Sequence, residues 1–366
     1  MISHYSGLVP LGKRTVEHMS GSMGGHMGMM EGGDSPNQDT TVYPGWFFIA
    51  SLVMLVVFLP VMFYLSYTLN NLLPTLAMIE DPSPPAYEPL SNNPDDAEAP
   101  APAVSGPITS SLRQTSRMLR SIGGFKSFFR GFWCAFVASM AMSLAQNFFA
   151  AFLPNFAASL LAPLPAIMIT LPLTTAWTHI IMSAPKSAPW YRRLPPSRKT
   201  FAALWRPALV VWLAVGISTS VPAGMLAAFG ISKDAMAKNS DVSGLGWKIP
   251  LTLIIGLVLG LGLMVPSHVL FTRIQASLLP VDDEPIIAFD RSFGGNVEPE
   301  VVGGKGYATM AQAWKTFSRE NWMRLIKLYA KVIGVSFAAY LVMAAVFVPT
   351  WIVALKHSHH EPVGST

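Results

Sequence analysis

Five stretches of the chain contain no Asp, Glu, Lys or Arg and consist mainly of apolar residues. They cover residues 40–79, 131–185, 207–232, 249–272 and 332–355. A helix needs about 20 apolar residues to cross the hydrocarbon core of a bilayer, so four of these stretches are suited to one span each. The second stretch is long enough for two spans, and Pro154 and Asn155 provide a turn between them.

This pattern predicts an all-α integral membrane protein with six transmembrane helices. The predicted spans lie at about 46–69, 131–152, 157–182, 205–229, 249–275 and 332–355. Residues 1–45 are expected to form a disordered tail and residues 356–366 a short second tail. Within the membrane domain of residues 46–355, the sequence predicts a Pro-rich acidic linker at 80–112 and an acidic loop at 276–320.

Composition supports this class of protein. Of the 366 residues, 51% are hydrophobic and only 12% are charged, about half the charged share of a soluble domain. The single cysteine, Cys134, excludes a disulfide within the chain and has no catalytic partner nearby in sequence. We therefore expect Cys134 to be a buried thiol, and the sequence predicts neither an enzyme nor a cofactor.

The basic residues are distributed unevenly between the two ends of the predicted spans. Nineteen of the 25 Lys and Arg residues fall in the segments around 113–130, 186–206 and 273–331, and the other six fall in the tails and the remaining loop. Basic loops stay on the inner side of a membrane. The asymmetry predicts that both termini lie on the side opposite the basic loops. It also explains the net charge of +5, so we expect no nucleic-acid partner.

The odd and even spans carry two alternating signatures. Pro60, Pro172 and Pro266 each lie about ten residues before an odd span ends, and a proline there frees a carbonyl and bends the helix. Even spans begin with an aromatic residue close to a basic one, as in Phe129-Arg130-Gly131 and Trp205-Arg206. Aromatic and basic side chains also favour the interface in any membrane protein. The alternation predicts a threefold pseudo-repeat of helix pairs.

Two of these motifs resemble signatures of the mitochondrial carrier family. Thr272-Arg273-Ile274-Gln275 is similar to the family's sequence after an odd span, and Phe129-Arg130-Gly131 to its entry into an even span. The resemblance covers about residues 46–355. It implies six helices in three repeats, both termini on one side and a location in a mitochondrial membrane.

The positions of the family's inner gate differ in this chain. The family closes that gate with ion pairs between odd spans, whereas the equivalent positions here carry no charge. Met62, Thr174 and His268 stand at the acidic positions, and Leu65, Trp177 and Phe271 stand at the basic ones. Charged side chains, which usually mark transport sites, are absent from the predicted spans two, four and six apart from their boundaries.

The missing gate favours a carrier-like protein that does not transport. We expect a non-enzymatic role in membrane organisation or partner recruitment, in the outer rather than the inner mitochondrial membrane. The alternative is a transporter of a small solute or of copper. A plasma-membrane or endomembrane location also remains open.

A second resemblance concerns the loop at residues 281–295. Its sequence, beginning Val281-Asp282-Asp283-Glu284-Pro285, is similar to that of fungal multi-pass membrane proteins labelled ubiquitin carrier protein. Conjugating chemistry requires a reactive cysteine, and the only cysteine lies at a membrane boundary. The loop therefore indicates relatedness and does not predict that activity.

The acidic linker contains a candidate partner motif. Pro84-Pro85-Ala86-Tyr87 fits the Pro-Pro-x-Tyr ligand of WW domains, which bind preformed polyproline II segments. Proline-rich linkers also produce such tetrapeptides by chance. The expected partners are thus the lipid bilayer and, at this motif, a WW-domain protein.

The N-terminal tail contains thioether and imidazole side chains that suit Cu(I). The candidate ligands are His18, Met19, Met23, His26, Met27, Met29 and Met30. Low-complexity composition without metal binding is the competing interpretation.

Overall fold

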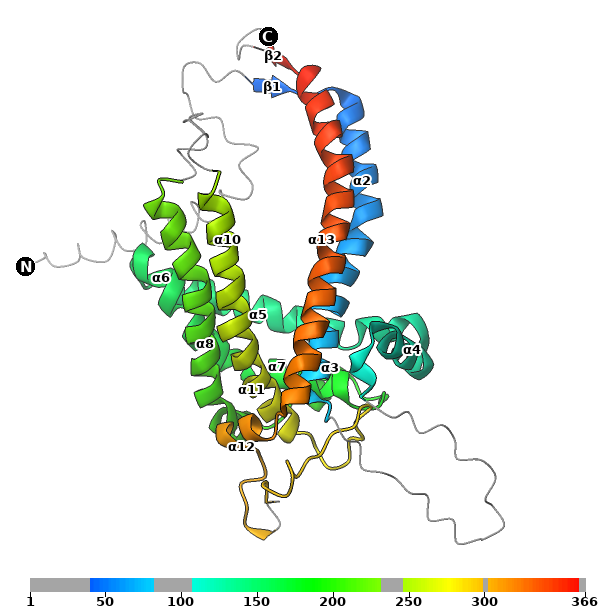
Figure 1. Ribbon diagram of the computed structural model, residues 1–366, viewed down its shortest axis with the longest axis vertical. Helices are drawn as coiled ribbons and strands as arrows, with labels where there is room; N and C mark the ends of the chain where they lie inside the picture. Colours follow the sequence, from blue (N-terminus) through cyan, green and yellow to red (C-terminus); the bar gives the residue numbers. More distant parts are fainter. Residues whose placement is uncertain (1–39, 82–106, 232–245, 299–301, 362–366) are drawn as a thin grey trace, which may run out of the picture. The chain divides into compact units, whose positions relative to one another are not determined.

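The computed structural model describes residues 40–81, 107–231, 246–298 and 302–361 (Figure 1). It contains six helices that are long and apolar enough to cross a membrane. They run over Gly45–Ile79, Leu112–Ala150, Ala157–Met182, Ser197–Ala228, Lys248–Ser277 and Arg319–Lys356. The predicted all-α fold with six spans is confirmed, and the chain is a multi-pass integral membrane protein. The threefold repeat stays a prediction.

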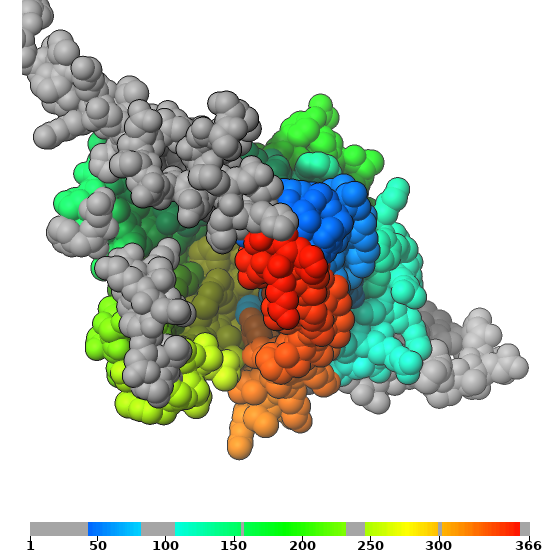
Figure 2. Space-filling view, turned by 90° about the horizontal axis from the view of Figure 1, so that it is seen from above, coloured from blue at the N-terminus to red at the C-terminus, as the bar shows by residue number. Residues whose placement is uncertain are grey.

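The chain divides into two compact units, of which the first combines residues 1–58 with residues 341–366. Its described part contains the first part of α2 (Gly45–Tyr64) and the last part of α13 (Arg319–Lys356). Figure 2 shows the red end of α13 against the blue start of α2. Aromatic rings join the two helices, with Phe47 and Trp351 centred 5.3 Å apart and Phe58 and Phe347 5.6 Å apart. Two short antiparallel strands, β1 (Thr40–Val42) and β2 (His359–Glu361), pair beyond them.

The second unit, residues 59–340, contains the other helices. They are α3 (Leu73–Ile79), α4 (Leu112–Gly123), α5 (Phe132–Ala150), α6 (Asn155–Leu161), α7 (Pro163–Met182), α8 (Ser197–Ala228), α10 (Lys248–Leu259), α11 (Val265–Ser277) and α12 (Met310–Lys315). Helix α7 packs against α5, α8 and α11, while α11 also packs against α3 and α8. Helices α8 and α10 lie side by side (Figure 1).

Burial in the second unit is concentrated at one end of these helices. The main apolar core includes six residues between Leu72 and Ile79 of the first span, Ile181 and Met182 of α7, and Ala276 of α11. By contrast, no more than 22% of the most apolar window of any of the six described spans is buried. The middle parts of the spans therefore present apolar surface that suits lipid.

The prolines of the odd spans lie near irregular helical turns. The first span changes to a π-helical segment at Leu65–Leu72, after Pro60, and a second π-helical segment at Gly260–Met264 directly precedes the turn with Pro266. Pro172 lies inside α7. Proline lacks the amide that would bond the preceding turn, and local π turns are one way in which a membrane helix accommodates the loss.

The helices extend beyond the charge-free stretches on the basic side. Helix α13 begins at Arg319, although its charge-free part begins at residue 332, and α8 begins at Ser197. Helix α4 lies ahead of the charge-free part of the second span and places Arg113, Arg117 and Arg120 at helical spacing on one face. The basic loops are thus partly helical, which brings charged residues to fixed positions near the ends of the spans.

Candidate functional site

Polar side chains of the first and third spans meet at the end of the second unit where the basic segments around 113–130, 186–206 and 273–331 lie, which we call the basic end. The indole Nε1 of Trp177 donates to the hydroxyl of Tyr67 at 3.0 Å, and that hydroxyl donates to the carbonyl of Arg130. Trp177 is one of the six positions that the resemblance in the sequence predicts as gate positions. Its contact with Tyr67 is uncharged and lies directly before the second span.

Gln275 joins the third and fifth spans in the same region. Thr178 Oγ1 donates to Gln275 Oε1 at 2.8 Å, and Gln275 Nε2 donates to Thr174 Oγ1 at 3.2 Å. The main-chain carbonyl of Gln275 lies 2.9 Å from Nε2 of His179. A carbonyl only accepts, so this contact requires the His179 tautomer with its proton on Nε2. Gln275 and His179 are both almost fully buried.

Arg273 joins the fifth span to the end of the first. Its guanidinium is 1% exposed, lies 3.8 Å from the carboxylate of Asp81, and donates to Thr316 Oγ1 at 3.0 Å. The rings of Phe293 and Phe317 lie 5.0 and 5.3 Å from the guanidinium carbon, within the range of cation–π attraction. We call the contacts made by Tyr67, Trp177, Thr178, Gln275 and Arg273 the odd-span junction.

Arg130 and Gly131 give the aromatic–basic motif a structural role. Arg130 Nη2 donates to the carbonyls of Ile180, at 3.1 Å, and Ser183, so the motif caps the end of α7. Gly131 has φ +70°, and a Cβ atom there would lie 3.1 Å from Trp177 Cδ1. Glycine is therefore required both by the backbone and by the close approach of α7.

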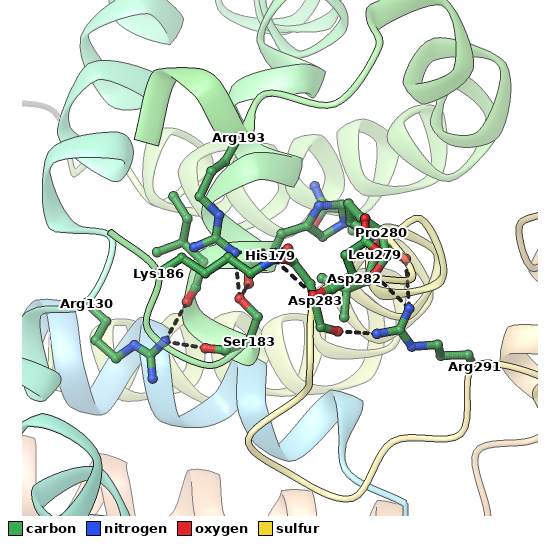
Figure 3. A network of polar contacts seen from close by, with 12 residues as sticks. Arg130, His179, Ser183, Lys186, Arg193, Leu279, Pro280, Asp282, Asp283 and Arg291 are labelled. Atoms are coloured by element: carbon green, nitrogen blue, oxygen red, sulfur yellow. Dashed lines mark hydrogen bonds and ion pairs between the residues drawn. The ribbon is translucent and has the colours of Figure 1, made fainter. Parts of the chain in front are cut away.

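Asp283 links the predicted acidic loop by ion pairs to the segment that follows α7. Its carboxylate pairs with Lys186 and, at 3.0 Å, with Arg193, whose Nη2 also donates to Ser183 Oγ at 2.7 Å (Figure 3). Burial alone would raise the pKa of Asp283, but its hydrogen bonds and charge pairs with Lys186 and Arg193 outweigh burial and lower that pKa. Arg291 closes the same loop by donating to the carbonyls of Asp283 and other loop residues.

Asp81 and Asp290 hold the other side of this loop. The Asp81 carboxylate accepts from the amide of Asp290 at 2.6 Å. Burial raises the pKa of Asp81, even though Arg273 acts in the opposite direction. The pKa of Asp290 is lowered instead, because hydrogen bonds from Ser292 and Gly294 to its carboxylate outweigh burial.

A buried pair that the sequence did not predict joins Glu80 and Arg324. Glu80 is 1% exposed, and its Oε2 lies 3.2 Å from Arg324 Nη1. The same carboxylate accepts from the amides of Ile108 and Thr109 at 2.6 and 3.0 Å. The available signal was that Glu80 is the first acidic residue after the first charge-free stretch. Arg324 lay within a segment rich in basic residues, where nothing in the sequence distinguished it from its neighbours.

The remaining predicted positions are dispersed or lie outside the described residues. Cys134 is buried with its Sγ 3.5 Å from the carbonyl of Leu173. Phe129 stacks on the Tyr67 ring of the junction with ring centroids 6.3 Å apart, and Thr272 is buried next to Arg273. The Met/His residues of the N-terminal tail and Pro84-Pro85-Ala86-Tyr87 lie outside the described residues. In the part of the chain that the structure describes, no group of three or more His, Cys, Asp or Glu residues is arranged to hold a metal.

His179 and Ser183, which lie beside the junction, both use their side chains in structural hydrogen bonds to main-chain carbonyls. His179 Nε2 is engaged by a main-chain carbonyl, and the hydroxyl of Ser183 donates to the carbonyl of His179 at 2.6 Å. Neither group is thus paired as base and nucleophile. Comparison of the chain with family models and with curated proteins finds no match in either set.

Proposed function

We propose that this multi-pass membrane protein is non-enzymatic and acts in membrane organisation or partner recruitment on a degenerate carrier-like fold. The observation that carries the proposal is the odd-span junction. Its buried, mostly uncharged hydrogen bonds join the first, third and fifth spans, and they include Thr174 and Trp177, two positions that the proposed relationship aligns with the carrier gate.

The energetics of the junction favour a fixed arrangement. Alternating access requires that the contacts closing one end of a transporter break and re-form. Separation of the third span from the first and fifth would leave the Trp177 indole and the Gln275 side chain without the partners described above, and each unpaired buried group costs about 1–3 kcal/mol. Arg273 would also leave the Asp81 carboxylate at the end of the first span. A fixed junction suits a scaffold better than a transporter.

The proposal includes a relationship to the mitochondrial carriers and a matching location. We place the protein in a mitochondrial membrane, outer rather than inner, with both termini opposite the basic loops. The bilayer is one partner, and a WW-domain protein at Pro84–Tyr87 is the second. A fluorescent fusion checks the location, and accumulation at the plasma membrane or in endomembranes would contradict it. Loss of WW-domain binding on Tyr87→Ala checks the partner.

A transport assay tests the proposed function directly. The purified protein is reconstituted into proteoliposomes, and uptake and counter-exchange of radiolabelled carboxylates, amino acids and nucleotides are measured. We expect uptake no faster than in protein-free vesicles for the wild-type protein. The same result is expected for Gln275→Met, which loosens the junction. Saturable exchange by the wild-type protein would overturn the proposal.

The alternative function, transport of a small solute or of copper, has one structural observation in its favour. Two odd spans contain π-helical segments near their prolines, and such segments often occur at functional sites. The copper form of this alternative predicts that uptake is lost when Ser replaces Met19, Met23, Met27, Met29 and Met30. Unchanged copper uptake in that variant would remove it.

A further inference from the structure

A cavity of about 380 Å³ lies beside the first two turns of α13. Its volume is within the range of small-molecule sites. Its walls include Pro107 and Ser110 on one side and the α13 residues Glu320, Asn321, Arg324 and Lys327 on the other. The cavity is separate from the odd-span junction, and none of the functions considered above uses it.

One buried acid holds both walls of this cavity in place. Glu80 accepts hydrogen bonds from the amides of Ile108 and Thr109, which lie in the wall segment between Pro107 and Ser110. The same carboxylate pairs with Arg324 of α13 at 3.2 Å. Arg324 Nη2 also donates to the main-chain carbonyls of Ala77 and Glu80. The cavity is therefore a built feature of the fold.

The inner wall carries polar atoms without partners. Asn321 is 0% exposed, and neither its Nδ2 nor its Oδ1 has a hydrogen-bond partner among the described residues. Arg324 Nε is likewise buried and unpaired there. A buried polar group left unpaired costs about 1–3 kcal/mol, so the wall is suited to a ligand that both accepts and donates hydrogen bonds.

The rim of the cavity carries one charge of each sign. Glu320 and Lys327 are both exposed, and neither has an ion-pair partner in the described part of the chain. They are seven positions apart in the helix, which corresponds to about 10 Å along the axis. Asn321 and Arg324 lie between them along the helix. The rim thus offers an anion and a cation to the two ends of one small molecule.

We propose that this cavity binds a small zwitterion in which a phosphate is joined to a primary ammonium, as in phosphoethanolamine. The phosphate accepts from Lys327, Arg324 Nε and Asn321 Nδ2, since charge-assisted hydrogen bonds to phosphate are strong. The ammonium donates to Glu320 and to Asn321 Oδ1. Each unpaired polar atom of the wall then has a partner of the correct kind.

Free phosphoethanolamine and the headgroup of phosphatidylethanolamine share this chemistry. Lys327 lies closer than Glu320 to the charge-free stretch 332–355 of α13. In a phosphatidylethanolamine whose chains enter the bilayer, the phosphate likewise lies closer to the hydrocarbon core than the ammonium does. The phosphate would thus face Lys327 and the ammonium would face Glu320. Basic pockets near the inner ends of transmembrane helices commonly bind lipid headgroups.

Two binding measurements distinguish the sources. The full-length protein in phospholipid-free detergent is titrated with O-phosphoethanolamine by calorimetry, and separately with phosphatidylethanolamine or phosphatidylglycerol by native mass spectrometry. Saturable binding of O-phosphoethanolamine supports a free ligand, and binding of phosphatidylethanolamine alone supports a headgroup. Failure of both probes, or equal affinity for phosphatidylglycerol, overturns the proposal.

Variants of the rim and wall complete the test. Lys327→Gln and Glu320→Gln change exposed side chains, and each should weaken binding about tenfold, the expected effect of one charge-assisted hydrogen bond. Asn321→Leu should abolish binding while the thermal unfolding midpoint shows that the variant is folded. Lys315→Gln, an exposed lysine of α12 outside the cavity, is the matched control and should bind as the wild type does. Unchanged affinity in both rim variants would overturn the proposal.

Discussion

Arginines at the basic end of the second unit bind main-chain carbonyls as well as carboxylates. Arg130 donates to residues at the end of α7, Arg273 and Arg324 to residues near the end of α3, and Arg291 to residues just after α11. The last carbonyls of a helix have no partner within the helix and carry partial negative charge. The basic residues that indicate topology in the sequence therefore also cap the odd spans.

At the scale of single residues, Gly131→Ala should destabilise the protein by about 2–4 kcal/mol. The positive φ of Gly131 strains any other residue, and the new Cβ atom would press against Trp177 and Ile180. Gly230→Ala is the matched control, because Gly230 has φ +73° and open space around it. Its cost should be about 1–2 kcal/mol. Chemical unfolding in detergent measures both, and equal costs would show that the Trp177 contact is unimportant.

Asp283→Asn should destabilise the protein at neutral pH by about 3 kcal/mol, since it leaves Lys186 and Arg193 without their carboxylate. The pKa of Asp283 is lowered in the folded state, so its contribution is complete above about pH 4 and is lost as the pH falls through the folded value. Unfolding midpoints of the wild type and the variant should thus converge in acid. A difference that does not change with pH would contradict this expectation.

Asp81→Asn should show the opposite trend. Because the pKa of Asp81 is raised in the folded state, the wild type loses stability as the pH rises through that value, and the neutral variant does not. The variant should therefore gain stability relative to the wild type as the pH increases. The same unfolding series measures this effect, and a relative loss on raising the pH would contradict the raised pKa.

At the scale of helices, Gln275 is the main polar link between the third and fifth spans. Gln275→Met should cost only about 1 kcal/mol, the usual range for hydrogen bonds between membrane helices. Thr178 Oγ1 keeps a second acceptor in the carbonyl of Thr174, and the contact of His179 with the main chain at position 275 remains. Gln146→Met, on α5 outside the junction, is the control and should be neutral. Thermal unfolding in detergent compares the two, and a neutral Gln275→Met would argue against the junction.

The charge-free stretches predict where each span lies but not where each helix ends. A bilayer selects for about 20 apolar residues, whereas helix length is set by capping and by packing on the basic side. Lys327 and Lys331 illustrate the difference, because both belong to α13 although they lie outside the predicted span at 332–355. The π-helical segments were also unpredictable, since Pro60 and Pro266 indicate a disturbance without defining its form.

Residues of the candidate site could be predicted from the sequence only where they belong to a short recognisable motif. Arg130-Gly131 and Arg273-x-Gln275 were singled out from their neighbours, and both residues of each motif make close contacts at the basic end. Glu80, Arg324 and Asn321 were missed because their roles depend on partners far away along the chain. A single sequence contains no signal that pairs such residues.

At the scale of the whole molecule, the basic loops and both termini are expected on opposite sides of the membrane. In a Cys134→Ala background, Ser187→Cys marks the loop after the third span and Ser358→Cys marks the end of the sixth. A membrane-impermeant maleimide applied to sealed vesicles should label only one of the two until the vesicles are permeabilised. Labelling of both in intact vesicles would place the two sites on the same side and contradict the predicted topology.

The pairing of Glu80 with Arg324 also sets an order of assembly during synthesis. The two residues are 244 positions apart, so at 5–20 residues per second Glu80 is made about 10–50 s before its partner. During that interval the carboxylate has no cation to bury against, and it must remain hydrated at the membrane surface. The contacts that Arg324 makes with the end of the first span therefore form only after the start of the last helix has been synthesised.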